Sequence, residues 1–431
     1  MAQKGFEQDG ARKELLLGTL MIFFVLVVLG PLMTIGMALD PNQMDGEGTQ
    51  VRQIAYILVA ATMAFSLRPA VNYKRLFVIP LPLLIGLALC AVSIAWAIEP
   101  GISVRRFVLT ALVMWTLFAG VRNLDYEESM TLFRIVLLLL LITNYVAVMV
   151  APDYAIHTLN TPEEKGLVSD WRGIMQHKNF AGSTCAVTAI VFWFDADRFN
   201  RWVRWAVIAA AAYFLERSGS KTSFGMGIAA IAAGAFYLYY DGRYKGVIVG
   251  VIATLGIIVT TAGFLFWNPM DVNFSDPKAF TGRPLIWKAM IAFIEDNPIL
   301  GSGFGSFWNI GPTSPVYHYA SGWPSRVATG HNGFLDLAVQ LGIPGLILGV
   351  AVAIVWPLIR LISQASQSSR RGAMVIALFL FCVGHNFTES SLFDRDEFVW
   401  ITLMLAIALT ENITVAARRG FDPAKVRRAT V

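Results

Sequence analysis

Long apolar stretches, each close to the length that a helix needs to cross a bilayer, dominate this sequence. A hydrocarbon core about 30 Å thick requires about 20 mostly apolar residues in helical conformation. Of the 431 residues, 56% are hydrophobic and only 15% are charged, whereas an ordinary soluble chain carries about 25% charged residues. So much apolar surface cannot be buried in a water-soluble core. The sequence therefore predicts an all-α polytopic membrane protein and excludes a cytosolic enzyme, a nucleic-acid binder and a disordered scaffold.

Hydropathy predicts about twelve transmembrane helices, which form a single integral membrane domain over residues 1–431. The first apolar stretch follows basic residues, as in a secretory signal peptide. It is too long for such a peptide and lacks a small-residue cleavage pattern, so we expect an uncleaved span. The predicted spans are 16–38, 53–67, 77–97, 106–121, 131–150, 179–195, 202–215, 223–240, 246–267, 333–359, 372–386 and 397–411.

The distribution of Lys and Arg predicts the orientation of these spans. Most of the basic residues fall in alternate short connections, in the N-terminal segment and in the tail 412–431. The positive-inside rule places this side, and with it both termini, in the cytoplasm. The other side carries two longer segments, 151–178 and 268–332. The second connects spans nine and ten and is too long for a structureless loop, so we expect it to be folded and functional.

Apolar residues recur at helical spacing inside the long loop 268–332. A Thr and an early Pro at the start of 281–296 are helix-start signals, and Asn297-Pro298 would end the helix. Arg283 falls in its first turn. Glycines then alternate in the segment 301–308, where they would permit close approach of a ligand and offer backbone N–H groups to an anion.

Aromatic residues gather in the polar part of the same loop. Their rings would suit stacking on the flat faces of sugar rings, or they would anchor the loop at the membrane interface, and the sequence leaves both readings open. The residues are Trp308, Tyr317, Tyr319 and Trp323.

Polar residues also mark the beginning of the tenth span. Asn332, Asp336 and Gln340 share one helix face, and polar groups at membrane depth usually line a cavity. His331 directly precedes this stripe. The spacing of the five histidines matches no zinc pattern, so no metal site is predicted. The three cysteines lie in apolar stretches and form no disulfide framework.

Four basic residues lie near the outer mouths of predicted spans, where charge is otherwise sparse. If they converge with nearby hydroxyls and backbone N–H groups, they would suit a diphosphate. The four are Arg172, Lys178, Lys221 and Arg283.

Several short motifs, taken in order over roughly 95–400, resemble the O-antigen ligase and Wzy-type polymerase superfamily. The turn Ser218-Gly-Ser-Lys-Thr222 and the segment His177-Lys178-Asn179 resemble the same family, and the latter is most similar to exopolysaccharide polymerases of the ExoQ type. The main motifs are Arg283-x-x-Ile286-Trp287, Asn297-Pro298-x-x-Gly301-x-Gly303-x-Gly305-Ser306-Phe307 and His331-Asn332-x-Phe334-Leu335.

The resemblance implies a multi-pass glycosyltransferase of the bacterial inner membrane whose active site faces the periplasm. Its donor would be a glycan on undecaprenyl diphosphate, so no sugar nucleotide, metal or other cofactor is expected. Arg283 matches the loop arginine expected to hold the diphosphate, and His331 matches the histidine expected at the reacting centre. The family usually has Arg at the position of Lys221. Lys keeps the positive charge of Arg but cannot bind in the same bidentate geometry.

The resulting expectation is an exopolysaccharide polymerase in which His331 and Arg283 are catalytic. Arg283, Lys221, Arg172 and Lys178 would bind diphosphate, and Trp308, Tyr319, Trp323 and Asn332 would bind glycan. An O-antigen ligase, which would transfer the glycan to lipid A core, is the alternative within the family. A lipid-linked glycan transporter and a non-catalytic assembly protein are the alternatives of other classes. Expected partners are the lipid-linked glycan, membrane lipid and other polysaccharide assembly and export proteins, but not nucleic acid.

Overall fold

The structure is a computed structural model, which describes residues 2–30, 50–158, 167–239, 242–244, 246, 282–364 and 370–420. Helices make up the fold of these residues, as the sequence predicts, and the one β-bridge joins Ile156 to Trp171. The helices are α1 (Ala2–Leu29), α2 (Gln50–Ser66), α3 (Leu81–Val92), α4 (Pro100–Asn123), α5 (Tyr126–Val150), α6 (Pro152–Ala155), α7 (Lys178–Trp193), α8 (Arg201–Arg217), α9 (Lys221–Tyr237), α11 (Arg283–Asp296), α12 (Val316–Tyr319), α13 (Gly333–Val350), α14 (Trp356–Gln364), α15 (Arg370–His385) and α16 (Phe398–Gly420).

Among the described residues, three helical stretches are long and apolar enough to cross a membrane. They are Pro100–Asn123, Tyr126–Val150 and Gly333–Ser363, and the shorter apolar helices Leu81–Trp96 and Phe398–Thr410 accompany them. These helices fit a membrane protein. The predicted total of twelve spans stays a prediction, and of the ninth predicted span, 246–267, all but residue 246 lies outside the described residues.

Side-chain caps explain where several helices begin. Asp125 and Glu128 form a capping box at the start of α5. The Asn332 side chain accepts hydrogen bonds from the backbone N–H groups of Phe334 and Leu335 at the start of α13. At the start of α7, the His177 ring accepts from the N–H of Asn179. These acceptors satisfy backbone donors that a helix N-terminus otherwise leaves unpaired.

Two helices near the end of the chain form the centre of the bundle. Almost every described side chain of α15 and α16 is buried, and Trp400 is fully buried. Helices that are apolar all round pack inside a larger bundle, and here α4, α7 and α9 surround the pair. The segment 386–397, which connects α15 to α16, is therefore attached to the most buried part of the protein.

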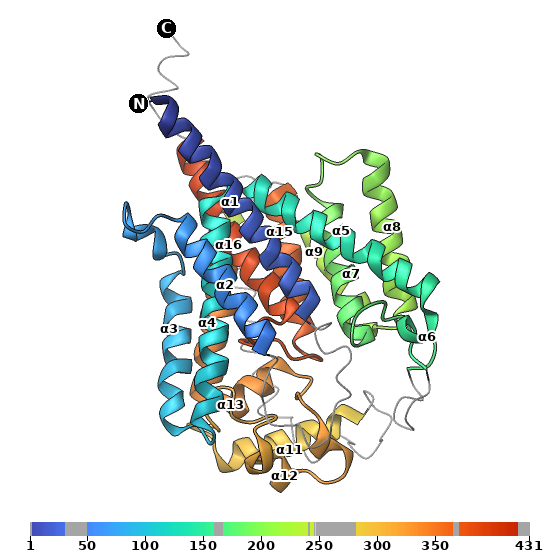
Figure 1. The fold of residues 1–431 in the computed structure, drawn as a ribbon. Helices are drawn as coiled ribbons and strands as arrows, with labels where there is room; N and C mark the ends of the chain where they lie inside the picture. The colour runs from blue at the N-terminus through green and yellow to red at the C-terminus, as the bar shows by residue number, and fades with distance from the viewer. Residues whose placement is uncertain are drawn as a thin grey trace.

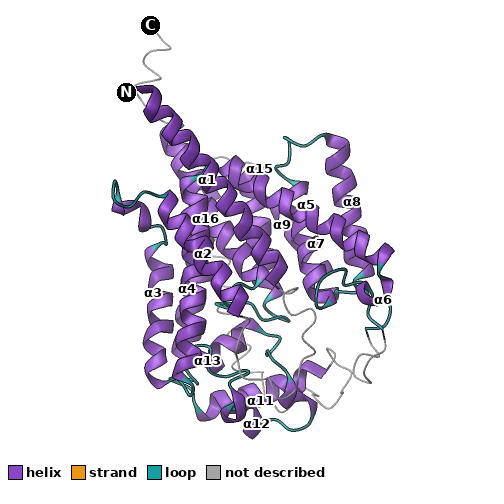
Figure 2. Cartoon of the chain, in the orientation of Figure 1, coloured by secondary structure: helices purple, strands orange, loops and turns teal. Residues whose placement is uncertain are grey.

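The long loop predicted between spans nine and ten is partly helical where it is described. Its helix, α11, begins at Arg283 rather than Thr281 and lies with α12 across one end of the bundle, opposite the Ala2 end of α1 (Figure 1). Non-helical segments run between α11, α12 and α13 (Figure 2). Ile286, Met290 and Phe293 of α11 pack on Phe307 and Val339, so this end has a small apolar core of its own.

The glycine-rich segment passes against α13 where that helix is broken. Gly342 has φ 69° and ψ −178°, so the helical hydrogen-bond pattern is interrupted there. This segment and the residues just before it supply replacement partners, since the Ile343 N–H donates to the Pro298 carbonyl at 2.8 Å and the Ser302 N–H to the Val339 carbonyl at 2.9 Å. These bonds satisfy backbone groups that the interruption would otherwise leave unpaired.

Gly303 should be the least replaceable glycine of this segment. Its φ is +85°, and an added Cβ would lie 2.4 Å from the Cα of Ala97. Gly311 also has a positive φ, +79°, but an added Cβ there would meet nothing within 4 Å. We expect Gly303→Ala to lower the free energy of unfolding by about 1–3 kcal/mol more than Gly311→Ala, because only the first adds a clash. Unfolding in detergent would measure both, and equal losses would contradict this packing.

Candidate functional site

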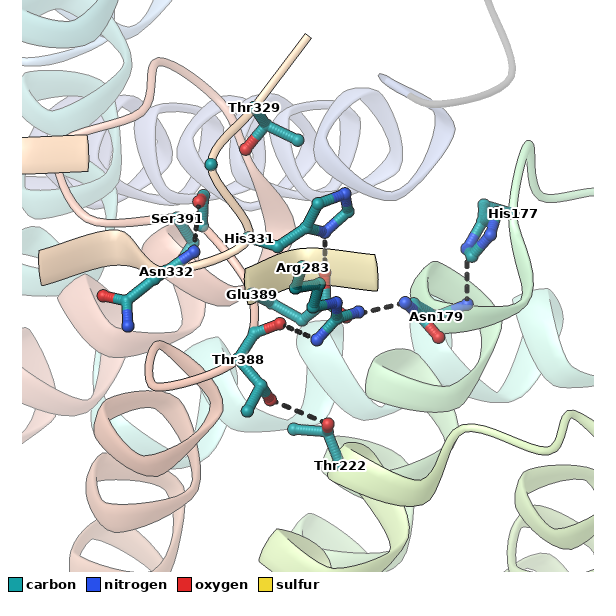
Figure 3. A network of polar contacts seen from close by, with 12 residues as sticks. His177, Asn179, Thr222, Arg283, Thr329, His331, Asn332, Thr388, Glu389 and Ser391 are labelled. Atoms are coloured by element: carbon teal, nitrogen blue, oxygen red, sulfur yellow. Dashed lines mark hydrogen bonds and ion pairs between the residues drawn. The ribbon is translucent and has the colours of Figure 1, made fainter. Parts of the chain in front are cut away.

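Four segments that lie far apart in the sequence meet at one polar cluster. They are the start of α7, the start of α11, the residues preceding α13 and the segment 386–397 (Figure 3). The last of these is firmly held. The Asn386 side chain accepts from the N–H groups of Ser391 and Leu392, and Arg52 of α2 pairs with Asp396 at 2.5 Å. The cluster is thus built on rigid supports from both halves of the chain.

Glu389 is the centre of this cluster. Its Oε1 accepts hydrogen bonds from Arg283 Nη2 at 2.5 Å and from Asn179 Nδ2 at 2.6 Å, and its Oε2 is 3.0 Å from His331 Nδ1. Burial by itself raises the pKa of Glu389. The hydrogen bond with His331 and the charge of Arg283 act in the opposite direction and lower that pKa to about 2. Glu389 is therefore an anion at neutral pH.

The contact with Glu389 determines how the His331 ring is protonated. An ionised carboxylate can only accept, so Nδ1 of His331 carries the proton and Nε2 of the neutral ring is an acceptor. The His331 side chain keeps 28% of its exposure. Its backbone has φ 51°, an uncommon value for a residue other than glycine. The preceding Gly330 is held by Asp336, whose Oδ2 accepts from the Gly330 N–H at 3.2 Å.

Arg283 uses only part of its hydrogen-bonding capacity within the cluster. Its Nη1 donates to the Thr388 carbonyl and its Nη2 to Glu389. A guanidinium has five N–H donors, so donors remain for a further acceptor. The side chain is 14% exposed. Arg283 can therefore orient Glu389 and still contact an anionic ligand.

The residue after Lys221, Thr222, contacts the cluster. The hydroxyls of Thr222 and Thr388 are 2.7 Å apart, and Arg283 binds the carbonyl of that same Thr388. Lys221 is exposed at the first position of α9. The start of α9 is therefore close to the cluster, and a role of the Lys221 side chain as a diphosphate ligand stays a prediction.

The other two predicted diphosphate ligands have intramolecular partners. Lys178 Nζ is 2.6 Å from Asp170 Oδ2. Arg172 donates from Nε to the Tyr154 carbonyl at 2.8 Å, and its guanidinium lies 5.1 Å from the centre of the Tyr154 ring. Both side chains brace the outer segment 167–178, although His177 and Asn179, on either side of Lys178, do reach the cluster.

The predicted glycan-binding residues are placed differently from one another. Trp308 is only 7% exposed and donates a hydrogen bond to Asp336 at 2.6 Å, so its ring packs in the protein interior. Asn332 caps α13 and donates to the Phe387 carbonyl. Tyr319 donates to Asp296 at 2.8 Å. Trp323 is 37% exposed, and its ring lies against Gly282, next to Arg283.

The glycine-rich segment does not offer the N–H groups that its sequence suggests. The Phe304 N–H donates to Ser93 Oγ at 3.0 Å and the Gly305 N–H to Gln340 Oε1 at 2.7 Å. Arg106 of α4 donates to the carbonyls of Gly305, Trp308 and Asn309. This segment is a packed support beneath His331 rather than an anion site.

A cavity of about 320 Å³ opens beside the cluster. Such a volume falls within the range of small-molecule sites, about 300–1,000 Å³. Within the described ranges, no three His, Cys, Asp or Glu side chains are placed to hold a metal ion. The cavity is lined by His177, Asn179, Phe180, Ser183, Thr329, His331, His385, Glu389, Ser390, Ser391, Asp394 and Glu397.

Glu389 is the residue that reasoning from the sequence did not single out. It stands in a connection of about twelve residues that has no periodicity and matches no quoted motif. The available signal was the concentration of four acids there, Glu389, Asp394, Asp396 and Glu397, in a chain with only 29 acidic residues. His177 and Asn179 were noted only as part of a motif, without a role.

Fold and site together fit a membrane protein with a partly enclosed cavity beside an Arg–Glu–His cluster. Residues 205–350 match the family model described as O-antigen ligase. This match confirms, over that segment, the superfamily that the motifs predict, while the finer likeness to ExoQ-type polymerases stays a prediction. Among curated proteins, none matches the chain.

The low pKa of Glu389 should make folding sensitive to acid. Because this pKa lies below its ordinary value of 4.5 and near 2, its stabilisation is present above pH 4.5 and is lost as the pH falls toward 2. Between pH 7 and pH 3, the stability of Glu389→Gln should therefore fall by about 2 kcal/mol less than that of the wild type. Unfolding in detergent at both pH values would measure this. The exposed Glu295→Gln is the matched control, and a Glu389→Gln variant that keeps the wild-type pH dependence would contradict the assignment.

Proposed function

We propose that this chain is a glycosyltransferase that polymerises oligosaccharide repeat units carried on undecaprenyl diphosphate. The observation that carries the proposal is the contact of one largely buried carboxylate, Glu389, with both a cation, Arg283, and an imidazole, His331, at the wall of a cavity. The match of residues 205–350 to O-antigen ligase supports an enzyme that acts on lipid-linked glycans.

The proposed reaction is an inverting transfer at an anomeric carbon. A hydroxyl of the acceptor sugar attacks that carbon and forms the new glycosidic bond. The bond from the anomeric carbon to the diphosphate oxygen breaks, and undecaprenyl diphosphate leaves with the electron pair. The proton of the attacking hydroxyl passes to His331 Nε2, the ring nitrogen that the Glu389 contact leaves unprotonated. General-base assistance of this kind typically contributes about 10²–10⁴-fold.

The cations stabilise the leaving group. Diphosphate gains negative charge as the bond breaks, and donors already fixed in place stabilise such charge without reorganisation. Arg283 is fixed by Thr388 and Glu389 and retains N–H groups for phosphate oxygens. Lys221, exposed at the start of α9 next to Thr222, which contacts Thr388, supplies the second positive charge.

Glu389 has two parts in this scheme. It keeps the proton on His331 Nδ1 so that Nε2 faces the substrate as a base, and it stabilises the imidazolium formed when the proton arrives. It also fixes the guanidinium of Arg283. A shared carboxylate of this kind links the group that takes the proton to the group that receives the leaving charge.

The site is proposed to face the periplasm, with the protein in the bacterial inner membrane and both termini in the cytoplasm. The orientation rests on the distribution of Lys and Arg between the two sides. In agreement with it, α11 and the Ala2 end of α1 lie at opposite ends of the bundle (Figure 1). Sugar nucleotide and metal are not needed in this scheme, because the diphosphate is already attached to the donor.

Transfer to lipid A core is the second candidate function. The family model that matches is described as O-antigen ligase, and a ligase would use the same donor and the same leaving group. The two functions differ only in the acceptor. We favour polymerisation because the His177-Lys178-Asn179 segment is similar to ExoQ-type polymerases.

Reconstitution with a defined donor would test the function. Purified protein in liposomes would receive undecaprenyl-diphosphate-linked repeat units without sugar nucleotide or metal, and products would be resolved by length. A ladder of longer glycans still attached to the lipid is expected. Transfer that occurs only when lipid A core is supplied would establish the ligase instead. Failure of both reactions in correctly folded protein would exclude a glycosyltransferase of either kind.

Arg283→Ala should abolish the ladder while the protein still inserts in the membrane. The variant removes a cation from the leaving group and leaves the Glu389 charge without its main partner. Arg283→Lys keeps the charge but not the fork that spans Thr388 and Glu389, so we expect only slight recovery. Lys221→Arg, which keeps charge at an exposed position, is the matched control and should stay active. Normal ladder formation by Arg283→Ala would refute this role.

A further inference from the structure

A second imidazole, His177, belongs to the cavity but has no part in the scheme above. The residue caps α7, where its Nδ1 accepts a hydrogen bond from the Asn179 N–H at 3.2 Å. A ring nitrogen that accepts carries no proton, so the neutral ring bears its proton on Nε2. The capping contact therefore makes His177 a hydrogen-bond donor toward whatever lies beside Nε2.

His177 and His331 line the same cavity from different elements. His177 precedes α7, whereas His331 precedes α13, and Figure 3 shows the His331 ring above the Arg283–Glu389 pair and the His177 ring to the right of it, above Asn179. Their hydrogen bonds impose opposite tautomers. His331 is protonated at Nδ1 and accepts at Nε2, while His177 accepts at Nδ1 and donates from Nε2.

The surroundings of His177 keep it uncharged. Burial is the largest influence and, together with the nearby His157, lowers the pKa of His177 to about 4. The ring of His157 packs edge-on against that of His177 at 5.4 Å between centres. Phe180 and Ser183, one and two turns along α7, line the same side of the cavity. This side thus offers neutral donors, a hydroxyl and an aromatic ring, which suit a sugar better than a phosphate.

We propose that His177 binds the acceptor sugar, donating Nε2–H to a hydroxyl oxygen next to the attacking hydroxyl. The inference rests on the proposed transferase function and adds a residue for acceptor binding. With one imidazole accepting from the sugar and the other donating to it, two neighbouring hydroxyls are distinguished by their hydrogen bonds. The sugar is thereby held with one particular hydroxyl at His331.

Substitutions can separate the capping of α7 by His177 from its proposed binding of the acceptor sugar. Ser and Asn are strong N-caps, so His177→Ser and His177→Asn keep the cap of α7 but lose the donor at the Nε2 position. Gln places an amide N–H about where Nε2 stands but is not a preferred N-cap. A purely structural role predicts normal activity for Ser and Asn and a defect for Gln. Acceptor binding predicts the reverse order.

The assay would use lipid-linked oligosaccharide extracted from the source strain after deletion of the gene for this chain. For His177→Ser and His177→Asn, loss of one neutral hydrogen bond should raise the half-saturating concentration by about 3- to 10-fold, with the maximal rate little changed. His177→Gln should lie closer to the wild type. The matched control is His318→Ser, at an exposed position on α12, which should leave the half-saturating concentration unchanged.

Each outcome decides one claim. Wild-type half-saturation in the Ser and Asn variants, or equal or greater loss in the Gln variant, would overturn the assignment of His177. Melting temperatures of all variants would show whether the cap is intact. If the wild-type protein itself transfers nothing from this donor, the proposed function fails, and that failure is visible before any variant is compared.

Discussion

The site depends on the burial of one carboxylate, Glu389, among three donors. Removing a charge from water is strongly unfavourable unless close partners replace the lost hydration. Arg283, Asn179 and His331 provide that replacement from α11, α7 and the residues preceding α13. Each of these elements is thus held to the segment 386–397 by the same charge. Loss of any one donor would leave the other contacts with an under-compensated anion, so the cluster is expected to respond to change as a unit.

The interruption of α13 at Gly342 creates the packing that supports this cluster. The break at Gly342 allows α13 to accept the glycine-rich segment, and Arg106 fixes the far side of that segment through three carbonyls. Trp308 then reaches Asp336, which also holds the Gly330 N–H next to His331. A chain of directional contacts therefore runs from α4 to the residues next to His331, the proposed base. Rigid positioning of this sort matters because catalytic groups lose effect when displaced by about 1 Å.

The sequence predicted the helices well because apolar length and turn residues are local signals. It also singled out Arg283 and His331, because their motifs resemble those of the superfamily; their catalytic roles stay a prediction. The sequence did not indicate Glu389, because the place of this residue in the cluster depends on partners 106 and 58 residues away. A short aperiodic connection has no local pattern that predicts such pairing. Charge alone was ambiguous for the same reason. For Lys178 and Arg172, binding to an anion stays a prediction, since Asp170 pairs with Lys178 and the Tyr154 carbonyl accepts from one of the five N–H groups of Arg172.

The distribution of charge around the cavity gives the proposed reaction a direction. Arg283, held by the Thr388 carbonyl and by Glu389, is a cation next to the cavity wall, whereas the α7 side of the cavity presents neutral groups, His177 and Ser183. In the proposed reaction, the charge of Arg283 attracts the lipid diphosphate, and the sugar finds hydrogen bonds without charge on the α7 side. Since His331 is tied to Arg283 through Glu389, the bond that breaks and the hydroxyl that attacks would meet at the same imidazole. A cation behind the cavity wall, with a base and a neutral donor on the wall itself, thus explains how a single site could align a charged leaving group with an uncharged acceptor.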